Sequence, residues 1–177
     1  MKKKTLALVL ALTLLVAGIV GGTLAWLTDQ TAEVKNTFTV GDINIGLTET
    51  TTDYKMVPGN TIAKDPTVTV KANSEACWLF VKVTESTDLK DFITYAIAEG
   101  WTALPGVDGV YYREVPASAA DQTFSVLAGD AVTVKSDVTR TMLETAKTDA
   151  PTLTFQAYAI QRDHFATADA AWVEVSK

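Results

Sequence analysis

Short stretches in which apolar and polar residues alternate, separated by turn residues, run along most of the chain after residue 36. A period of two places successive side chains on opposite faces of a strand, whereas a helix needs a period near 3.6. The predicted strands cover 37–47, 67–71, 77–83, 92–98, 110–115, 124–127, 131–135 and 153–160. Strands of this length, with Gly, Pro and Asp between them, predict an all-β fold, a two-sheet antiparallel sandwich with jelly-roll-like connections.

Three details refine this prediction. The strand at 77–83 is apolar on both faces at its start, so it is expected at the centre of a sheet. The alternation of apolar and polar residues shifts by one position around Gly41-Asp42, which indicates a bulge. Helix is expected only as one or two short segments, at 138–146 and 166–172.

The first 25 residues have the parts of a secretory signal peptide. A basic head at 2–4 precedes an apolar run at 5–20, which as a helix would measure about 24 Å, short of the ~30 Å hydrocarbon core of a bilayer. Thr23 and Ala25 are small enough for the positions three and one residues before a cut. Cleavage is therefore predicted between Ala25 and Trp26.

The alternative is an uncleaved anchor, whose apolar segment would extend through Leu27. With cleavage, the protein contacts the membrane only transiently. The chain then divides into a signal helix at 1–25, an extended N-terminal segment at 26–35 and a sandwich domain at 36–177. About 150 residues remain after cleavage, enough for one domain with a substantial core.

Charge and cysteine content set two further bounds. The leader contains three lysines and no acidic residue, so its removal changes the formal net charge from −6 to −9. No concentrated basic face is visible, and nucleic-acid binding is not expected. Cys77 is the only cysteine, so no intrachain disulfide can form. Its alternation with apolar residues predicts a buried, inert thiol.

The N-terminal region carries a family resemblance. It reads GGTLAWLTD at 21–29 and NTFTVG at 36–41, followed by the alternating Ile43, Ile45 and Leu47. This opening resembles that of the TasA/camelysin family, although Leu27 stands where the family pattern has Phe. The stretch FQAYAIQ at 155–161 and the late Ala171-Trp172 are similar, more loosely, to the last core strand and tail of some members.

The resemblance implies a location and a function. Members of this family are secreted proteins of Gram-positive bacteria, exported through a SipW-type signal peptidase, and the best understood of them build biofilm matrix fibres. It therefore implies a secreted, extracellular fibre subunit, located in the biofilm matrix or on the cell surface. The implied partners are the signal peptidase, other copies of the chain and other matrix proteins.

The resemblance further implies assembly by strand donation, in which each copy pairs a segment with the next. The segment at 26–35 lies before the first predicted strand and contains no Pro or Gly, so it could pair through its backbone. Asp29 interrupts its alternation, so its side chains would fill pockets only in part. The alternatives are a free tail and an edge strand within the same copy. The residues of the predicted polymerisation segment are Trp26, Leu27, Thr28, Asp29, Ala32 and Val34.

A function of a different class is a monomeric extracellular binding module for a polysaccharide or a protein. Its candidate contacts are Trp78, Trp101, Tyr111 and Tyr112. An exposed, coplanar row of these rings would favour the binding module. An unpaired sheet edge beside a detached N-terminal segment would favour the fibre subunit.

Catalytic signals are scarce. Some relatives carry a metallopeptidase label, which makes a camelysin-type metallopeptidase the third alternative, yet no His-Glu-x-x-His motif occurs. His164 is the only histidine, with Asp163 and Asp169 as the nearest carboxylates in sequence, and it is expected to lie exposed in a loop. A dyad of Cys77 and His164 would need an exposed thiol. The prediction is therefore no enzyme, with no catalytic residues, no metal and no cofactor.

Overall fold

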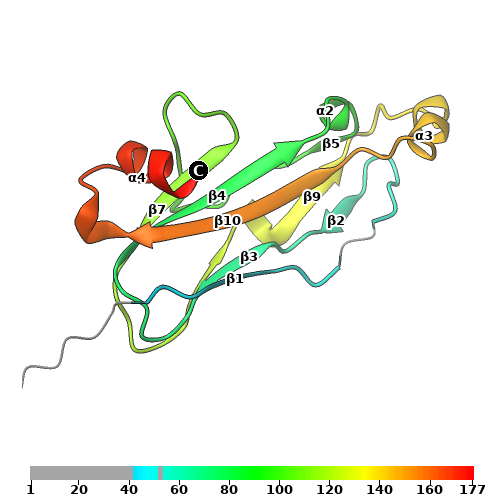
Figure 1. Cartoon of the computed structure of the whole chain (residues 1–177). Helices are drawn as coiled ribbons and strands as arrows, with labels where there is room; N and C mark the ends of the chain where they lie inside the picture. Colours follow the sequence, from blue (N-terminus) through cyan, green and yellow to red (C-terminus); the bar gives the residue numbers. More distant parts are fainter. Residues whose placement is uncertain (1–41, 52–53) are drawn as a thin grey trace, which may run out of the picture. The chain divides into compact units, whose positions relative to one another are not determined.

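The structure is a computed structural model that describes residues 42–51 and 54–177 (Figure 1). These residues belong to a compact unit that begins at Val40. The predicted signal peptide at 1–25 and the extended segment at 26–35 lie outside the described residues. The described part contains three antiparallel sheets and short helices, which confirms the predicted β class.

The largest sheet has the strand order β10-β4-β7-β6, and every pair in it is antiparallel. Its strands are β4 (Cys77–Glu85), β6 (Thr102–Ala103), β7 (Val110–Val115) and β10 (Leu153–Gln161). The predicted central position of 77–83 is confirmed, because β4 lies between β10 and β7. Burial on both faces explains the continuous apolar run of β4.

The other two sheets have the orders β1-β3-β8 and β2-β9-β5. The first is formed by β1 (Ile45–Thr48), β3 (Thr67–Val70) and β8 (Gln122–Ser125). The second is formed by β2 (Thr61–Ala63), β5 (Ile93–Thr94) and β9 (Ala131–Val134).

Two sheets were predicted, and the structure has three because two long strands are interrupted. Pro66 separates β2 from β3 and offers no N–H to a ladder. A 3-10 turn with positive φ at Gly129 (65°) and Asp130 (50°) separates β8 from β9. Hydrogen bonds still join the two sheets across these breaks, from Lys64 N–H to Asp130 O (2.8 Å) and from Val126 N–H to Pro66 O (2.9 Å).

The core lies mainly between the β1-β3-β8 sheet and the β10-β4-β7-β6 sheet. The fully buried side chains that fill it come from facing strands and from the residue that directly follows β8, and they are Val68, Val70, Cys77, Leu79, Val81, Val115 and Val126. A second cluster packs the β2-β9-β5 sheet against α2 (Leu89–Phe92) and α3 (Arg140–Ala146). The β1-β3-β8 and β2-β9-β5 sheets thus direct their apolar faces inward, as the alternation predicted.

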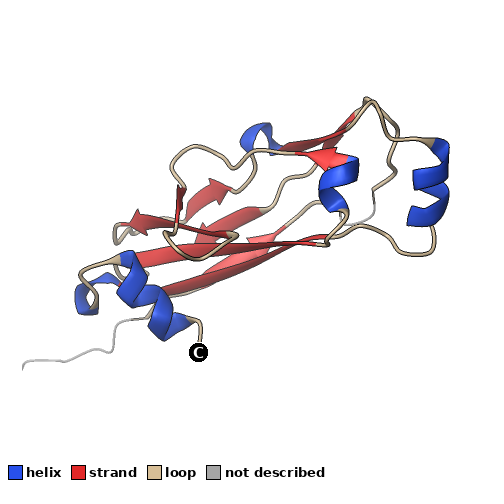
Figure 2. Ribbon diagram, turned by 90° about the horizontal axis from the view of Figure 1, so that it is seen from above, coloured by secondary structure: helices blue, strands red, loops and turns tan. Residues whose placement is uncertain are grey.

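Helix α4 (Ala168–Val175) covers the outer face of the largest sheet. Trp172 packs against Phe80 and Tyr158, with ring centroids 5.3 and 5.2 Å apart. Thr167 caps the helix by accepting a hydrogen bond from Ala170 N–H. Figure 2 shows α4 near one end of the long strands and α3 near the other. Among the described residues, no helix has the length and apolar character needed to cross a membrane.

One predicted strand is largely wrong. The stretch 92–98 contributes only β5 and a single bridge from Ile97 to Leu127, and helix α2 ends at Phe92. Leu89 and Phe92, three residues apart, bury one face of that helix, so the apolar spacing serves a helical turn. The two predicted helices occur as α3 and α4, whereas α2, β2 and β6 were not predicted.

Candidate functional site

Strand β10 has no neighbour on its outer side in the part of the chain that the structure describes. Val83 N–H donates to Gly109 O on the β7 side of β4. Backbone groups of a strand alternate in direction, so those of residues 78, 80, 82 and 84 point to β10. The register pairs those residues with 154, 156, 158 and 160. The outward-pointing N–H and C=O groups therefore belong to Leu153, Phe155, Ala157, Ala159 and Gln161.

Strand β1 forms a second free edge within the described residues. Lys71 N–H donates to Asn44 O (2.8 Å), and this phase turns the N–H and C=O groups of Ile45 and Leu47 away from β3. Cα atoms of β1 and β10 come within 8 Å of each other, yet no ladder joins the two strands. That separation is shorter than the ~10 Å between packed sheet faces, so the two edges adjoin. We call these adjoining edges the open side (Figure 1).

Apolar side chains line the open side and are only half-buried. Ile43 and Ile45 from the β1 region, and Phe155, Ala157 and Ala159 from β10, pack against the fully buried core. Their position at the margin of the sheets leaves part of each in water. A segment that entered the open side could cover these side chains and bond to either strand.

A buried ion pair lies next to this apolar strip. Lys64 Nζ contacts Glu49 Oε1 at 2.7 Å, and it lies 4.6 Å from the ring centroid of Tyr54 and 5.4 Å from that of Phe155. The Tyr54 hydroxyl donates to the same Glu49 oxygen at 2.7 Å. Burial, followed by this hydrogen bond, raises the pKa of Tyr54 far above its ordinary value. The pair fixes the segment after β1 against the start of β3 and β10.

The predicted cleavage bond between Ala25 and Trp26 lies outside the described residues. The predicted polymerisation segment lies outside them too, with its residues Trp26, Leu27, Thr28, Asp29, Ala32 and Val34. These predictions are untested by the geometry. The signals that sequence reasoning missed are the outward backbone groups of β1 and β10, which become visible only when the strand order is known.

The aromatic residues of the predicted binding module do not form an exposed row. Trp78 and Trp101 are buried, and their indole N–H groups donate to Phe165 O (3.0 Å) and Ser125 O (2.9 Å). Tyr112 packs edge-on against Trp78 with an interplanar angle of 64°. Two of the four rings therefore serve the core, and a third packs against it.

The guanidinium of Arg113 packs against the ring of Trp101. Its central carbon lies 5.3 Å from the Trp101 ring centroid and 3.9 Å from that of Phe124. Burial lowers the pKa of Arg113, and its Nε has no hydrogen-bond partner among the described residues. The cation lies between two rings, where cation–π attraction partly offsets its lost hydration.

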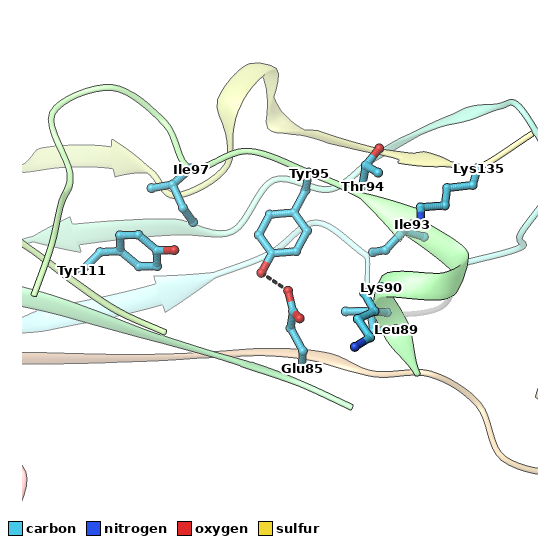
Figure 3. A pocket seen from close by; sticks show the side chains of 9 residues that line it. All are labelled: Glu85, Leu89, Lys90, Ile93, Thr94, Tyr95, Ile97, Tyr111 and Lys135. Carbon is cyan, nitrogen blue, oxygen red and sulfur yellow. Dashed lines mark hydrogen bonds between the residues drawn. The ribbon is translucent and has the colours of Figure 1, made fainter. Parts of the chain in front are cut away.

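Tyr111, the fourth predicted ring, lines a concave pocket of about 390 Å³ (Figure 3). The pocket lies between the end of β4, the start of β7 and the α2–β5 segment. Tyr95 stands at its centre, and its hydroxyl donates to Glu85 Oε1 at 2.5 Å. Burial and this hydrogen bond raise the pKa of Tyr95 well above its ordinary value. The sequence singled out Tyr111 but not Tyr95, because Tyr95 lies in the stretch mistaken for a continuous strand.

The two candidate catalytic side chains lie in different surroundings. Cys77 is fully buried, as predicted, and burial raises the pKa of its thiol to about 11. His164 is exposed in a 3-10 turn, as predicted, and lines a cavity of about 470 Å³ together with Asp163 and Glu114. Over residues 42–51 and 54–177, no three His, Cys, Asp or Glu side chains gather as metal ligands would.

Comparison with known proteins gives one match. The family model described as camelysin metallo-endopeptidase matches residues 1–89, which is half of the 177-residue chain. No match was found among curated proteins or among solved structures. The matched region includes β1, β2, β3 and β4, so it contains one of the two strands of the open side. The chain belongs to the camelysin family.

Proposed function

We propose that this chain is a secreted structural subunit of extracellular matrix fibres, joined head-to-tail by β-strand addition. The observation that supports this most is the open side, where the free edges of β1 and β10 adjoin beside a half-buried apolar strip. A free edge of this kind is a template for an added strand. The proposal takes the described unit as a jelly-roll-like sandwich that lacks one strand.

The proposed donor strand is the segment 26–35 of a neighbouring copy. It has a complete set of backbone N–H groups, each worth about 0.5 to 1.5 kcal/mol net when paired with the edge. Successive side chains of a strand lie on opposite faces, so Trp26 would bury against the strip and contribute roughly 1.5 to 3 kcal/mol, whereas Leu27 would point to the other face. Thr28, Ala32 and Val34 share the Trp26 face and are smaller contacts, and Asp29 lies on the opposite face with Leu27.

The same segment precedes β1, so it could also fill the open side of its own copy. Such intramolecular filling would close the edge and leave a monomer. Donation to a neighbour joins two different surfaces and does not close on itself, so it produces a filament. The two arrangements differ in oligomeric state, which makes the proposal testable.

The test compares the chain from residue 26 to 177 with the chain from residue 36 to 177, by electron microscopy and size exclusion at rising concentration. The longer chain should form filaments, and the shorter chain should stay a folded monomer with the same β-type circular dichroism. Addition of a synthetic 26–35 peptide should occupy the open side of the shorter chain and raise its melting temperature, whereas a peptide of scrambled sequence should not. Filaments from the shorter chain would rule out the donor role.

Export is part of the proposal. We infer that a SipW-type signal peptidase cuts before Trp26 and releases the subunit to the matrix or the cell surface. Mass analysis of the secreted protein should show Trp26, or a residue next to it, at the N-terminus. Ala25→Lys should leave the precursor in the membrane, because the position before the cut needs a small side chain. Secreted protein that retains residues 2–4 would contradict this step.

We also propose that the subunit acts without peptidase activity, although its family is named for a metallo-endopeptidase. Two observations support this: the chain has a single histidine, and the Cys77 thiol is buried. Purified protein should contain no stoichiometric zinc and should not cleave casein. Casein cleavage that His164→Ala abolishes, together with stoichiometric zinc, would overturn this part of the proposal.

A further inference from the structure

The pocket around Tyr95 has the dimensions and lining of a small-ligand site. Its volume of about 390 Å³ lies within the range of roughly 300 to 1,000 Å³ that is common for such sites. The half-buried rings of Tyr95 and Tyr111 and the side chain of Ile97 form an apolar surface inside it (Figure 3). Rings in this position can contact the C–H faces of a sugar.

Two lysine ammonium groups belong to the same pocket. Lys90 comes from helix α2, and Lys135 follows β9, where its backbone N–H donates to Phe92 O at 2.9 Å. Within the part of the chain that the structure describes, neither ammonium has a carboxylate within 4.0 Å. The pocket therefore presents two cations that no internal anion neutralises.

The one carboxylate of the pocket already has a partner. Glu85 accepts the Tyr95 hydroxyl, which holds the ring across the middle of the pocket. With two ammonium groups and one carboxylate, the lining carries one net positive charge on a chain whose formal net charge is −6. This local reversal of sign favours a ligand with one negative charge per bound unit.

We propose that this pocket binds a carboxylate-bearing sugar, a hexuronate unit of an acidic polysaccharide. The sugar carboxylate pairs with Lys90 and Lys135, and the pyranose ring lies against Tyr95 and Tyr111. Sugar hydroxyls bond to Thr94 and to the free oxygen of Glu85. The site is separate from the proposed fibre joint, because no residue of β1 or β10 lines the pocket.

The test titrates the purified secreted chain with a galacturonate oligomer and, in parallel, with an uncharged glucan oligomer of equal length. Binding of the galacturonate oligomer should be measurable by calorimetry and should weaken as salt is added. Lys90→Ala and Lys135→Met should each lower the association constant about tenfold. Lys55→Ala, which removes an exposed lysine outside the pocket, should leave it unchanged.

Three results would overturn the proposal. They are equal binding of the uncharged glucan, no effect of either pocket lysine in variants that keep the circular dichroism of the parent, and equal lysine-dependent binding of polyglutamate. The last would assign the pocket to acidic peptides. Filament formation, followed separately by electron microscopy, reports on the fibre proposal and is expected to be the same in all three lysine variants.

Discussion

Lys64 and Glu49 form an ion pair in which Nζ and Oε1 are 2.7 Å apart and the two side chains are only 8% and 16% exposed. The pair joins the segment after β1 to the residues that lead into β3. The Tyr54 hydroxyl bonds to the same carboxylate, and the Tyr54 and Phe155 rings lie beside the ammonium group. Water is therefore a poor substitute partner for either charge.

The first prediction follows from this burial. Glu49→Gln leaves the Lys64 charge buried without a counter-charge, so the free energy of unfolding should fall by about 2 to 3 kcal/mol. Glu144→Gln is the matched control, because it breaks the Lys147–Glu144 pair, whose side chains are 68% and 53% exposed. The control should change stability by no more than about 0.5 kcal/mol. Urea unfolding checks both, and equal losses would show that the buried pair has no special role.

The second prediction uses the outward phase of β10. The Ala157 N–H points to the open side, so Ala157→Pro removes a donor from the free edge and leaves the ladder to β4 intact. The variant should stay folded but elongate slowly or not at all. Ala157→Ser keeps the N–H and should assemble like the parent. Normal filaments from the proline variant would place the joint at another edge.

The third prediction concerns two glycines with positive φ. A Cβ at Gly109 would lie 2.5 Å from Val83 O, whereas one at Gly129 would meet nothing within 4 Å. Gly129→Ala should lower the free energy of unfolding only by the strain of a left-handed alanine, about 1 to 2 kcal/mol. Gly109→Ala adds a clash with the β4 backbone beside the Val83–Gly109 hydrogen bond, so it should lose clearly more. Thermal unfolding of both variants measures the difference, and equal losses would contradict the steric argument.

Sequence pattern was sufficient where a strand lies inside a sheet, between two neighbouring strands. The predicted 110–115 coincides with β7, and 77–83 lies within β4. It failed over 92–98, where Phe92 belongs to helix α2 and only Ile93 and Thr94 form a strand. It also overlooked β6, whose two residues are exposed and carry no alternation.

The candidate sites were less predictable than the strands. The outward groups of Ala157 and Ala159 depend on which strand neighbours β10, and no local pattern encodes that order. The pocket joins Glu85, Lys90 and Tyr111 from three separate elements, so their proximity is a property of the fold alone. By contrast, the burial of Cys77 followed from alternation, because one buried face was enough to predict it.

The last prediction is a pH dependence that Cys77 imposes on stability. Burial raises the pKa of its thiol from an ordinary value of 9.0 to about 11, because the thiolate would lose its hydration inside the core. Between these values the unfolded chain releases the proton while the folded chain keeps it, so the free energy of unfolding should fall as the pH rises from about 9 to about 11. Below about pH 9 the thiol should not make the free energy of unfolding depend on pH. Cys77→Val keeps an apolar side chain of similar size and removes the titration, so the difference between the two proteins isolates the contribution of the thiol. Urea unfolding across the window measures it. A parent and variant with parallel profiles would mean that the thiol titrates alike in the folded and unfolded chains.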